Sequence, residues 1–175
     1  MIRKLGLIGA AALLAMAAPA PAQEATPITD AQIAHVAYTA GQLDIEAAKQ
    51  ALEKSRNAEV RAFAETMVRD HAAVNDQALA LVKKLGVTPE ANATSAALAD
   101  GAAGKMRALA ALDGAAFDQA YAANEAAYHA TVNGALVGTL IPAADNAELK
   151  ALLETGLALF REHQAHAEHL AQSLD

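Results

Sequence analysis

Apolar residues recur every three or four positions along four long stretches of the chain, and this spacing places them on one face of an α-helix. Residues that typically cap helices stand at the start of three stretches, including a capping box formed by Thr29 and Gln32. Gly86 and Pro142 mark the ends of the second and third stretches. The predicted helices therefore cover residues 29–56, 57–86, 117–140 and 146–174.

The composition favours a fold made of helices alone. Of the 175 residues, 54% are apolar but only 3% are aromatic, so the core must form by close packing of helices rich in Ala and Leu. The segment 87–114 contains Pro89, Gly101 and Gly104, and we expect it to be a loop around one short helix at 105–112 that covers one end of the molecule. The sequence therefore predicts an all-α protein, an antiparallel up-down-up-down four-helix bundle with a short extra helix in the connection between its second and third helices.

The first 22 residues have the layout of a secretory signal peptide. A basic pair, Arg3 and Lys4, precedes an apolar stretch that ends at Ala18, and small residues follow up to Ala22. This stretch is too short to span a bilayer comfortably and no later segment is long and apolar enough, so we expect no membrane span in the mature, periplasmic chain. The predicted organisation is a signal peptide at 1–22 and a single helical-bundle domain at 23–175.

The charge balance excludes one class of partner. The chain carries 20 acidic and 13 basic residues, a formal net charge of −7, whereas binding to nucleic acid requires a basic face. It contains no cysteine, so disulfides and thiolate metal sites are also excluded. We expect no nucleic-acid partner, and the sequence leaves any protein partner open.

Polar residues interrupt the apolar face of each predicted helix. They are Asp44, His71, His129 and His163, with Glu125 one helical turn before His129. If the turns near residues 56 and 143 lie at the same end, a rise of 1.5 Å per residue places the first three within about 4 Å of one another in depth. The fourth lies about 8 Å further along, and the lean of side chains toward their helix N-terminus narrows that difference. The four side chains can therefore converge inside one bundle.

Two interpretations account for such a cluster. Three imidazoles and a carboxylate inside a helical bundle are typical of a transition-metal site, and a cluster rich in His and free of Cys suits Zn, Cu, Ni or Fe. The predicted metal ligands are Asp44, His71, His129, His163 and Glu125. The alternative is a metal-free hydrogen-bond network that also includes Tyr38 and Tyr121, in a structural or interaction protein of the cell envelope.

Other candidates carry less weight. A di-iron oxidase needs about four Glu and two Glu-x-x-His motifs in the core, which this sequence does not supply, so we assign no catalytic residue. Asp70 cannot share the direction of the adjacent His71, and we expect it to support a ligand or to face solvent. His35 and His166 are candidates for a second site at the surface.

The order of these residues resembles a known bacterial family. The most specific segment is Phe63-Ala64-x-x-Met67-Val68-x-Asp70-His71, followed by Phe117-Asp118-x-x-Tyr121, His129 and His163. The chain resembles, from about residue 33 to residue 170, the secreted ferritin-like family known as domain of unknown function 4142, formerly often labelled an outer membrane protein. The resemblance implies a ferritin-like bundle in the periplasm or cell envelope without a settled activity, and it supports the three His residues as ligands. The family commonly has Glu in place of Asp44 and Pro in place of Ala158.

We predict that the exported protein begins at Gln23 and fractionates with the soluble contents of the periplasm. Signal peptidase reads the basic region, the apolar region and the small residues before the cleavage point as a set. N-terminal sequencing of the protein from fractionated cells measures this directly. Protein retained in the inner membrane with Met1 intact would contradict the prediction.

Overall fold

The computed structural model describes residues 27–174, and this part of the chain is helical with no strand. The expectation of an all-α fold is thereby confirmed for the described residues. The predicted signal peptide at 1–22 lies outside them. Within residues 27–174, no helix combines the length and the apolar character that a membrane crossing requires.

The long helices begin and end close to the predicted positions. They are α1 (Asp30–Lys54), α2 (Ala58–Leu85), α3 (Ala93–Ala110), α4 (Gly114–Ala135) and α6 (Ala147–Ser173). Thr29 and Gln32 form the predicted capping box of α1, and the side chain of Asn57 caps α2. Gly86 ends α2 in the left-handed conformation, with φ of 66°, which glycine adopts without a steric penalty.

Pro142 lies within the helix predicted at 117–140 rather than beyond its end, contrary to expectation. The helix passes from α4 into a π-helical segment, Leu136–Leu140, and continues through Pro142 in the single turn α5 (Ile141–Ala143). A proline ring clashes with the carbonyl group four residues earlier, which here belongs to Gly138. The wider π turn contains this glycine and gives the ring room, so the helix extends as far as Ala143.

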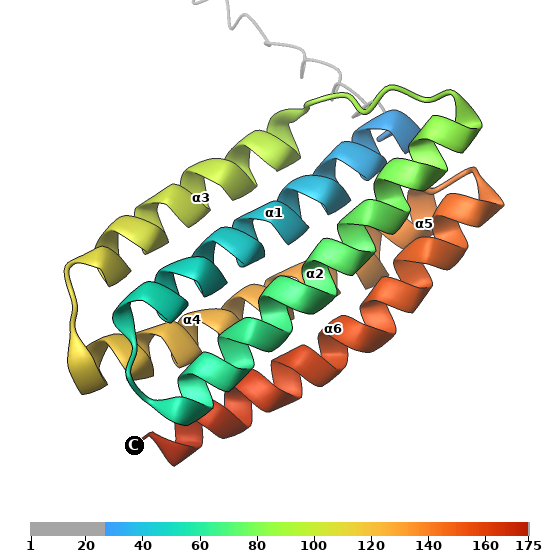
Figure 1. Ribbon diagram of the computed structural model, residues 1–175. Coiled ribbons are helices and arrows are strands. Elements are labelled where there is room, and N and C mark those ends of the chain that lie inside the picture. Colours follow the sequence, from blue (N-terminus) through green and yellow to red (C-terminus); the bar gives the residue numbers. More distant parts are fainter. Residues whose placement is uncertain (1–26, 175) are drawn as a thin grey trace, which may run out of the picture.

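The connection after α2 contains a full-length helix rather than the short one predicted at 105–112. Helix α3 has 18 residues, and Gly101 and Gly104 lie inside it. Asn92 and Ser95 form a capping box at its start, and this local signal outweighs two glycines that cost about 1 kcal/mol each in a helix. The helix lies along α1 instead of covering one end of the molecule (Figure 1).

Because α3 runs the length of the molecule, it sets the direction of the helix that follows. Lys54, at the end of α1, forms an ion pair of 2.9 Å with Asp113, directly before α4. At the opposite end, Asp30 accepts a hydrogen bond of 2.9 Å from the backbone N–H of Asn146, directly before α6. Helices α2 and α4 therefore run in the same direction (Figure 1). The predicted up-down-up-down order is wrong: α1, α2, α4 and α6 run up, down, down and up.

Two apolar clusters fill the space between these helices, on either side of a layer of polar residues. Helices α1, α2, α6 and α4 contact one another in this cyclic order, and α3 packs on α1 and α4. Phe63 and Phe117 belong to the cluster near the C-terminus of α6, and Phe160 belongs to the other. All three are buried, as the helical spacing of apolar residues predicts.

We predict that Phe63→Ala lowers the free energy of unfolding by about 3–5 kcal/mol, through lost burial and the cavity left behind. That is a large part of a typical total of about 5–15 kcal/mol. Leu79, which is 44% exposed, provides the control, because Leu79→Ala is expected to cost less than about 1 kcal/mol. Urea unfolding measures both values, and equal losses for the two variants would contradict the packing described here.

Candidate metal centre

The polar layer brings together all five residues that the sequence predicts as ligands. Each is at most 4% exposed, and four different helices contribute them. They are Asp44 of α1, His71 of α2, Glu125 and His129 of α4, and His163 of α6. The turns near residues 56 and 143 lie at opposite ends of the molecule, not at the same end as the depth estimate assumed. The five side chains still meet, because all of them lie near the middle of their helices, where the depth from either end is similar.

Three potential ligand atoms form a nearly equilateral triangle. Nε2 of His71 lies 3.4 Å from Nε2 of His129, and Oδ2 of Asp44 lies 3.5 Å from each of these nitrogens. Zinc binds imidazole nitrogen at about 2.0–2.1 Å in tetrahedral sites, so two of its ligand atoms are about 3.3–3.4 Å apart. The triangle therefore has nearly the dimensions of one face of a tetrahedral zinc site.

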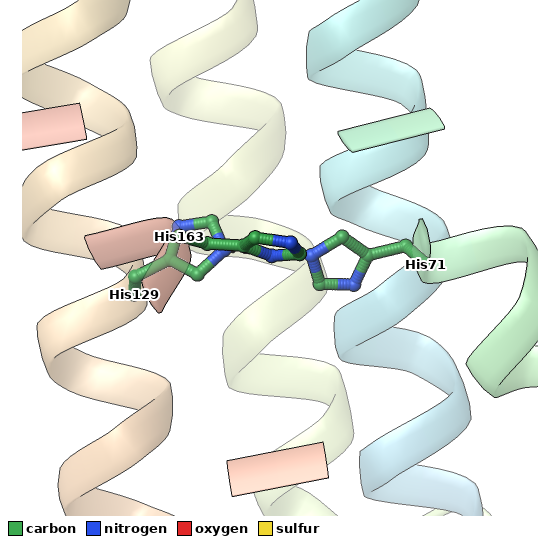
Figure 2. A group of neighbouring side chains, drawn as sticks. All are labelled: His71, His129 and His163. Atoms are coloured by element: carbon green, nitrogen blue, oxygen red, sulfur yellow. Dashed lines mark hydrogen bonds between the residues drawn. The ribbon is translucent and has the colours of Figure 1, made fainter. Parts of the chain in front are cut away.

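His163 lies beside this triangle and can supply a further ligand atom. Its ring centre is 5.3 Å from that of His71 and 5.4 Å from that of His129. The three imidazoles extend toward one another from α2, α4 and α6 (Figure 2). Each offers a nitrogen within 4.8 Å of a nitrogen of the other two, so the three rings form a group that could hold a metal ion.

Hydrogen bonds determine which nitrogen of two rings is free to bind a metal. Nδ1 of His129 donates to the backbone carbonyl of Glu125 at 3.0 Å, which leaves Nε2 with its lone pair toward the triangle. Nε2 of His163 donates to Oδ2 of Asp70 at 3.1 Å, and Nδ1 of His163 has no hydrogen-bond partner among residues 27–174. Metal-binding His residues are usually oriented by a carbonyl or carboxylate in this way.

Asp70 orients the ring of His163 and does not join the potential ligand atoms, in agreement with the expectation that it supports a ligand. Arg69 holds it at 2.8 Å, and the hydrogen bond from this guanidinium lowers the pKa of Asp70, so that it remains a carboxylate. Its partner His163 comes from a different helix, α6, and the spacing of residues along the sequence contains no signal for that pairing.

Burial keeps the imidazoles neutral. It lowers the pKa of His71 to about 3 and that of His129 to about 4, because a buried charge loses its hydration. Burial also lowers the pKa of His163, against the opposing effect of Asp70. Neutral imidazole is the form that binds a metal ion, so the three rings are ready to act as ligands over a wide pH range.

Burial has the opposite effect on the two carboxyl groups. It raises the pKa of Asp44 to about 7, and it raises that of Glu125 well above its ordinary value, with the charge of Asp44 as a further cause. The two carboxyl groups share a hydrogen bond when one of them is protonated, and the oxygens of Asp44 and Oε2 of Glu125 have no other hydrogen-bond partner in the described part of the chain. Buried polar groups that lack partners cost about 1–3 kcal/mol each, and a metal ion beside them would provide a further partner.

A pocket adjoins the two acidic residues of the cluster, Asp44 and Glu125. Asp44 and Glu125 line a space of about 220 Å³ between α1, α3 and α4, together with Tyr128, Lys105 and Met106. Asp44, Glu125 and His129 also form a second group with atoms close enough to hold an ion. The pocket reaches these two residues from outside, while both oxygens of Asp44 and Oε2 of Glu125 are buried beneath its surface.

The remaining sequence candidates lie outside the potential ligand groups, although Tyr121 is close enough to the cluster that burial and the charges of Glu125 and Asp44 raise its pKa. The hydroxyl of Tyr38 accepts a hydrogen bond from Gln42, and the hydroxyl of Tyr121 has no partner among the described residues, so neither tyrosine extends the proposed network. His35 lies 3.4 Å from Thr39, and neither it nor His166 belongs to a potential ligand group within residues 27–174.

These features define a class: an all-helical protein with imidazoles and carboxyl groups clustered in its interior. The chain belongs to the family described as "Domain of unknown function (DUF4142)", whose model matches residues 15–170. This confirms the family that the sequence motifs indicate. Neither a curated protein nor a solved structure matches the chain.

The opposing pKa shifts predict how stability depends on pH. Imidazoles in the unfolded chain bind protons below about pH 6.5, whereas the folded chain keeps His71 and His129 neutral down to about pH 3–4. Their contribution to stability is therefore complete above pH 6.5 and is lost as the pH falls. Asp44 acts in the opposite sense, because the folded chain holds a proton up to about pH 7 that the unfolded chain releases above about pH 4.

We predict that Asp44→Asn makes the metal-free protein lose stability more steeply as the pH falls from 6.5 to 4.5. The compensating carboxyl group is gone, so the slope should increase by up to about 1.4 kcal/mol per pH unit. Urea unfolding at several pH values measures the slope, with Asp76→Asn, an exposed carboxylate on α2, as the control. An unchanged slope in Asp44→Asn would contradict the raised pKa of this carboxyl group.

Proposed function

We propose that this protein is a periplasmic metal-binding protein in which four long helices form a ferritin-like bundle around one transition-metal ion. Helices α1, α2, α4 and α6 make the bundle, and α3 is the crossover between its two halves. The observation that carries the proposal is the triangle of Nε2 of His71, Nε2 of His129 and Oδ2 of Asp44, with sides of 3.4–3.5 Å. The signal-like first 22 residues support the location.

The proposed ligand set consists of one carboxylate and three imidazoles. Nδ1 of His163 completes the set, since its other nitrogen is held by Asp70 and its ring adjoins the two other imidazoles. Glu125 serves as a neighbouring carboxyl group on the acidic side, because its Oε2 lies 4.0 Å from the nitrogen of His129 that points away from the triangle. Three nitrogens and one oxygen in tetrahedral arrangement suit Zn²⁺ best among the candidate ions.

The chemistry of the ligands argues for holding a metal rather than for catalysis. A catalytic zinc site keeps one position open for water or substrate, whereas four protein ligands close the coordination shell. Asp44 would have to lose its proton on binding, and the ion would supply the positive charge that pairs with the resulting carboxylate. We therefore propose metal binding or storage in the periplasm, with the pocket between α1, α3 and α4 as the entry route.

We predict that Zn²⁺ raises the melting temperature of the wild-type protein at neutral pH. Zinc at 100 times its dissociation constant adds about 2.7 kcal/mol of stability, which corresponds to roughly 5–10 °C for a domain of this size. His71→Ala should weaken zinc binding by at least about tenfold, as expected from the loss of one ligand. His169→Ala, at an exposed His six residues further along α6 than His163, should bind zinc as the wild type does.

Calorimetric and thermal titrations with Zn²⁺, Ni²⁺ and Cu²⁺ measure these effects, and circular dichroism verifies that each variant is helical. His163→Ala provides a second test should His71→Ala fail to fold. A wild-type protein with no metal-dependent shift, combined with a lower melting temperature of His71→Ala without metal, would contradict the proposal. The cluster would then be the hydrogen-bond network of a structural protein.

A further inference from the structure

Helix α3 covers the side of the metal centre on which Asp44 and Glu125 lie. It packs on α1 and α4 at the edge of the molecule (Figure 1). The pocket of about 220 Å³ lies between these three helices, and both oxygens of Asp44 and Oε2 of Glu125 are buried beneath it. The wall that α3 gives to this pocket consists of Ala97, Leu98, Gly101, Ala102, Lys105 and Met106. Because the carboxyl oxygens have no accessible surface, a cation reaches them from this side only when part of the wall moves.

The middle of α3 is attached less firmly than its two ends. Only Ser95 and Leu109 of its 18 residues are buried, and they lie near the ends. Three side-chain hydrogen bonds join α3 and its cap to α1. They run from Nδ2 of Asn92 to the carbonyl of Gln32, from Nε2 of Gln50 to that of Met106 and from Nζ of Lys54 to that of Ala110, at 3.0–3.2 Å. All three lie outside residues 96–105, which form no hydrogen bond or ion pair with another helix in the described part of the chain.

Two glycines weaken the helix in the same stretch. Gly101 and Gly104 lie inside α3, where glycine is less favourable than alanine because its backbone loses more freedom on folding. A Cβ atom at either position would meet nothing beyond its own helical turn within 4 Å, and neither residue has a positive φ. Neither packing nor backbone conformation therefore requires glycine at these positions. Their effect is to lower the free energy that local opening of this stretch requires.

The other long helices are costlier to move. Helices α1, α2, α4 and α6 each bury at least seven residues, so displacing one of them exposes the apolar clusters to water, whereas residues 96–105 of α3 include none that is buried. We propose that the middle of α3, residues 96–105, is a lid that opens by local unfolding and lets a divalent cation pass from solvent to Asp44 and Glu125, while both ends of the helix stay attached. This inference rests on the proposed function, since it describes how the ion enters the metal centre.

Hydrogen exchange of the metal-free protein, followed by mass spectrometry, tests the opening without relying on a metal. Relative to their rates in an unfolded chain, the amides of residues 96–105 should exchange at least about tenfold faster than those of residues 40–49 in α1. Gly104→Ala should slow the exchange of the lid about fivefold, because alanine stabilises the closed helix. Gly134→Ala is the matched control, since this exposed glycine of α4 also has open space around its Cβ position, and it should leave the exchange of the lid unchanged.

Stopped-flow measurements of zinc uptake and release connect the opening to the metal centre. Gly104→Ala should slow both rates about fivefold and leave the dissociation constant unchanged, and Gly104 lies outside the pocket lining, so narrowing of the pocket does not account for the effect. Gly134→Ala should take up zinc at the rate of the wild type.

Two results would overturn the lid: exchange of residues 96–105 as slow as that of α1, or equal rates of zinc uptake in the wild type and Gly104→Ala. A wild type that binds no zinc would instead contradict the proposed function, and the exchange measurement would still decide whether α3 opens.

Discussion

The structure depends on burying three imidazoles and two carboxyl groups in one layer of an otherwise apolar interior. Helices made mostly of Ala and Leu pack closely enough to remove this layer from water, and the two apolar clusters close it on both sides. The loss of hydration then holds His71 and His129 neutral and keeps a proton on Asp44 up to about pH 7. The cluster is thus nearly uncharged although every member is titratable.

This electrostatic balance explains why a divalent cation suits the cluster. Neutral imidazoles contribute lone pairs without adding charge, and the proton of Asp44 is the one that a metal ion would replace. The supporting hydrogen bonds lie outside the ligand triangle: the Glu125 carbonyl orients His129, and Asp70 orients His163. Removing one ring would leave its former partners buried and unpaired, which is the reason that stability and binding have to be measured together.

The periodicity of apolar residues predicted the long helices and the residues of the polar layer, because each of these depends on one helix at a time. Features that depend on two helices escaped prediction. The 18-residue length of α3 reversed the expected direction of α4, because the helix begins at the cap formed by Asn92 and continues through Gly101 and Gly104. The burial of Asn75 on α2 likewise has no signal in the sequence, because it depends on the packing of Gly41 of α1 against it. A shift of one turn between two helices changes which residues meet, but it does not change the pattern of apolar residues within either helix.

X-ray absorption spectroscopy at the zinc edge of the zinc-loaded protein tests the central claim most directly, because it reports the ligands themselves. The account predicts four nitrogen or oxygen ligands at about 2.0–2.1 Å, with the outer scattering of three imidazoles around each zinc ion. Loss of one imidazole from this signature in His163→Ala would place that ring among the ligands. A six-coordinate shell of oxygen atoms without imidazole scattering would contradict a metal centre in the polar layer.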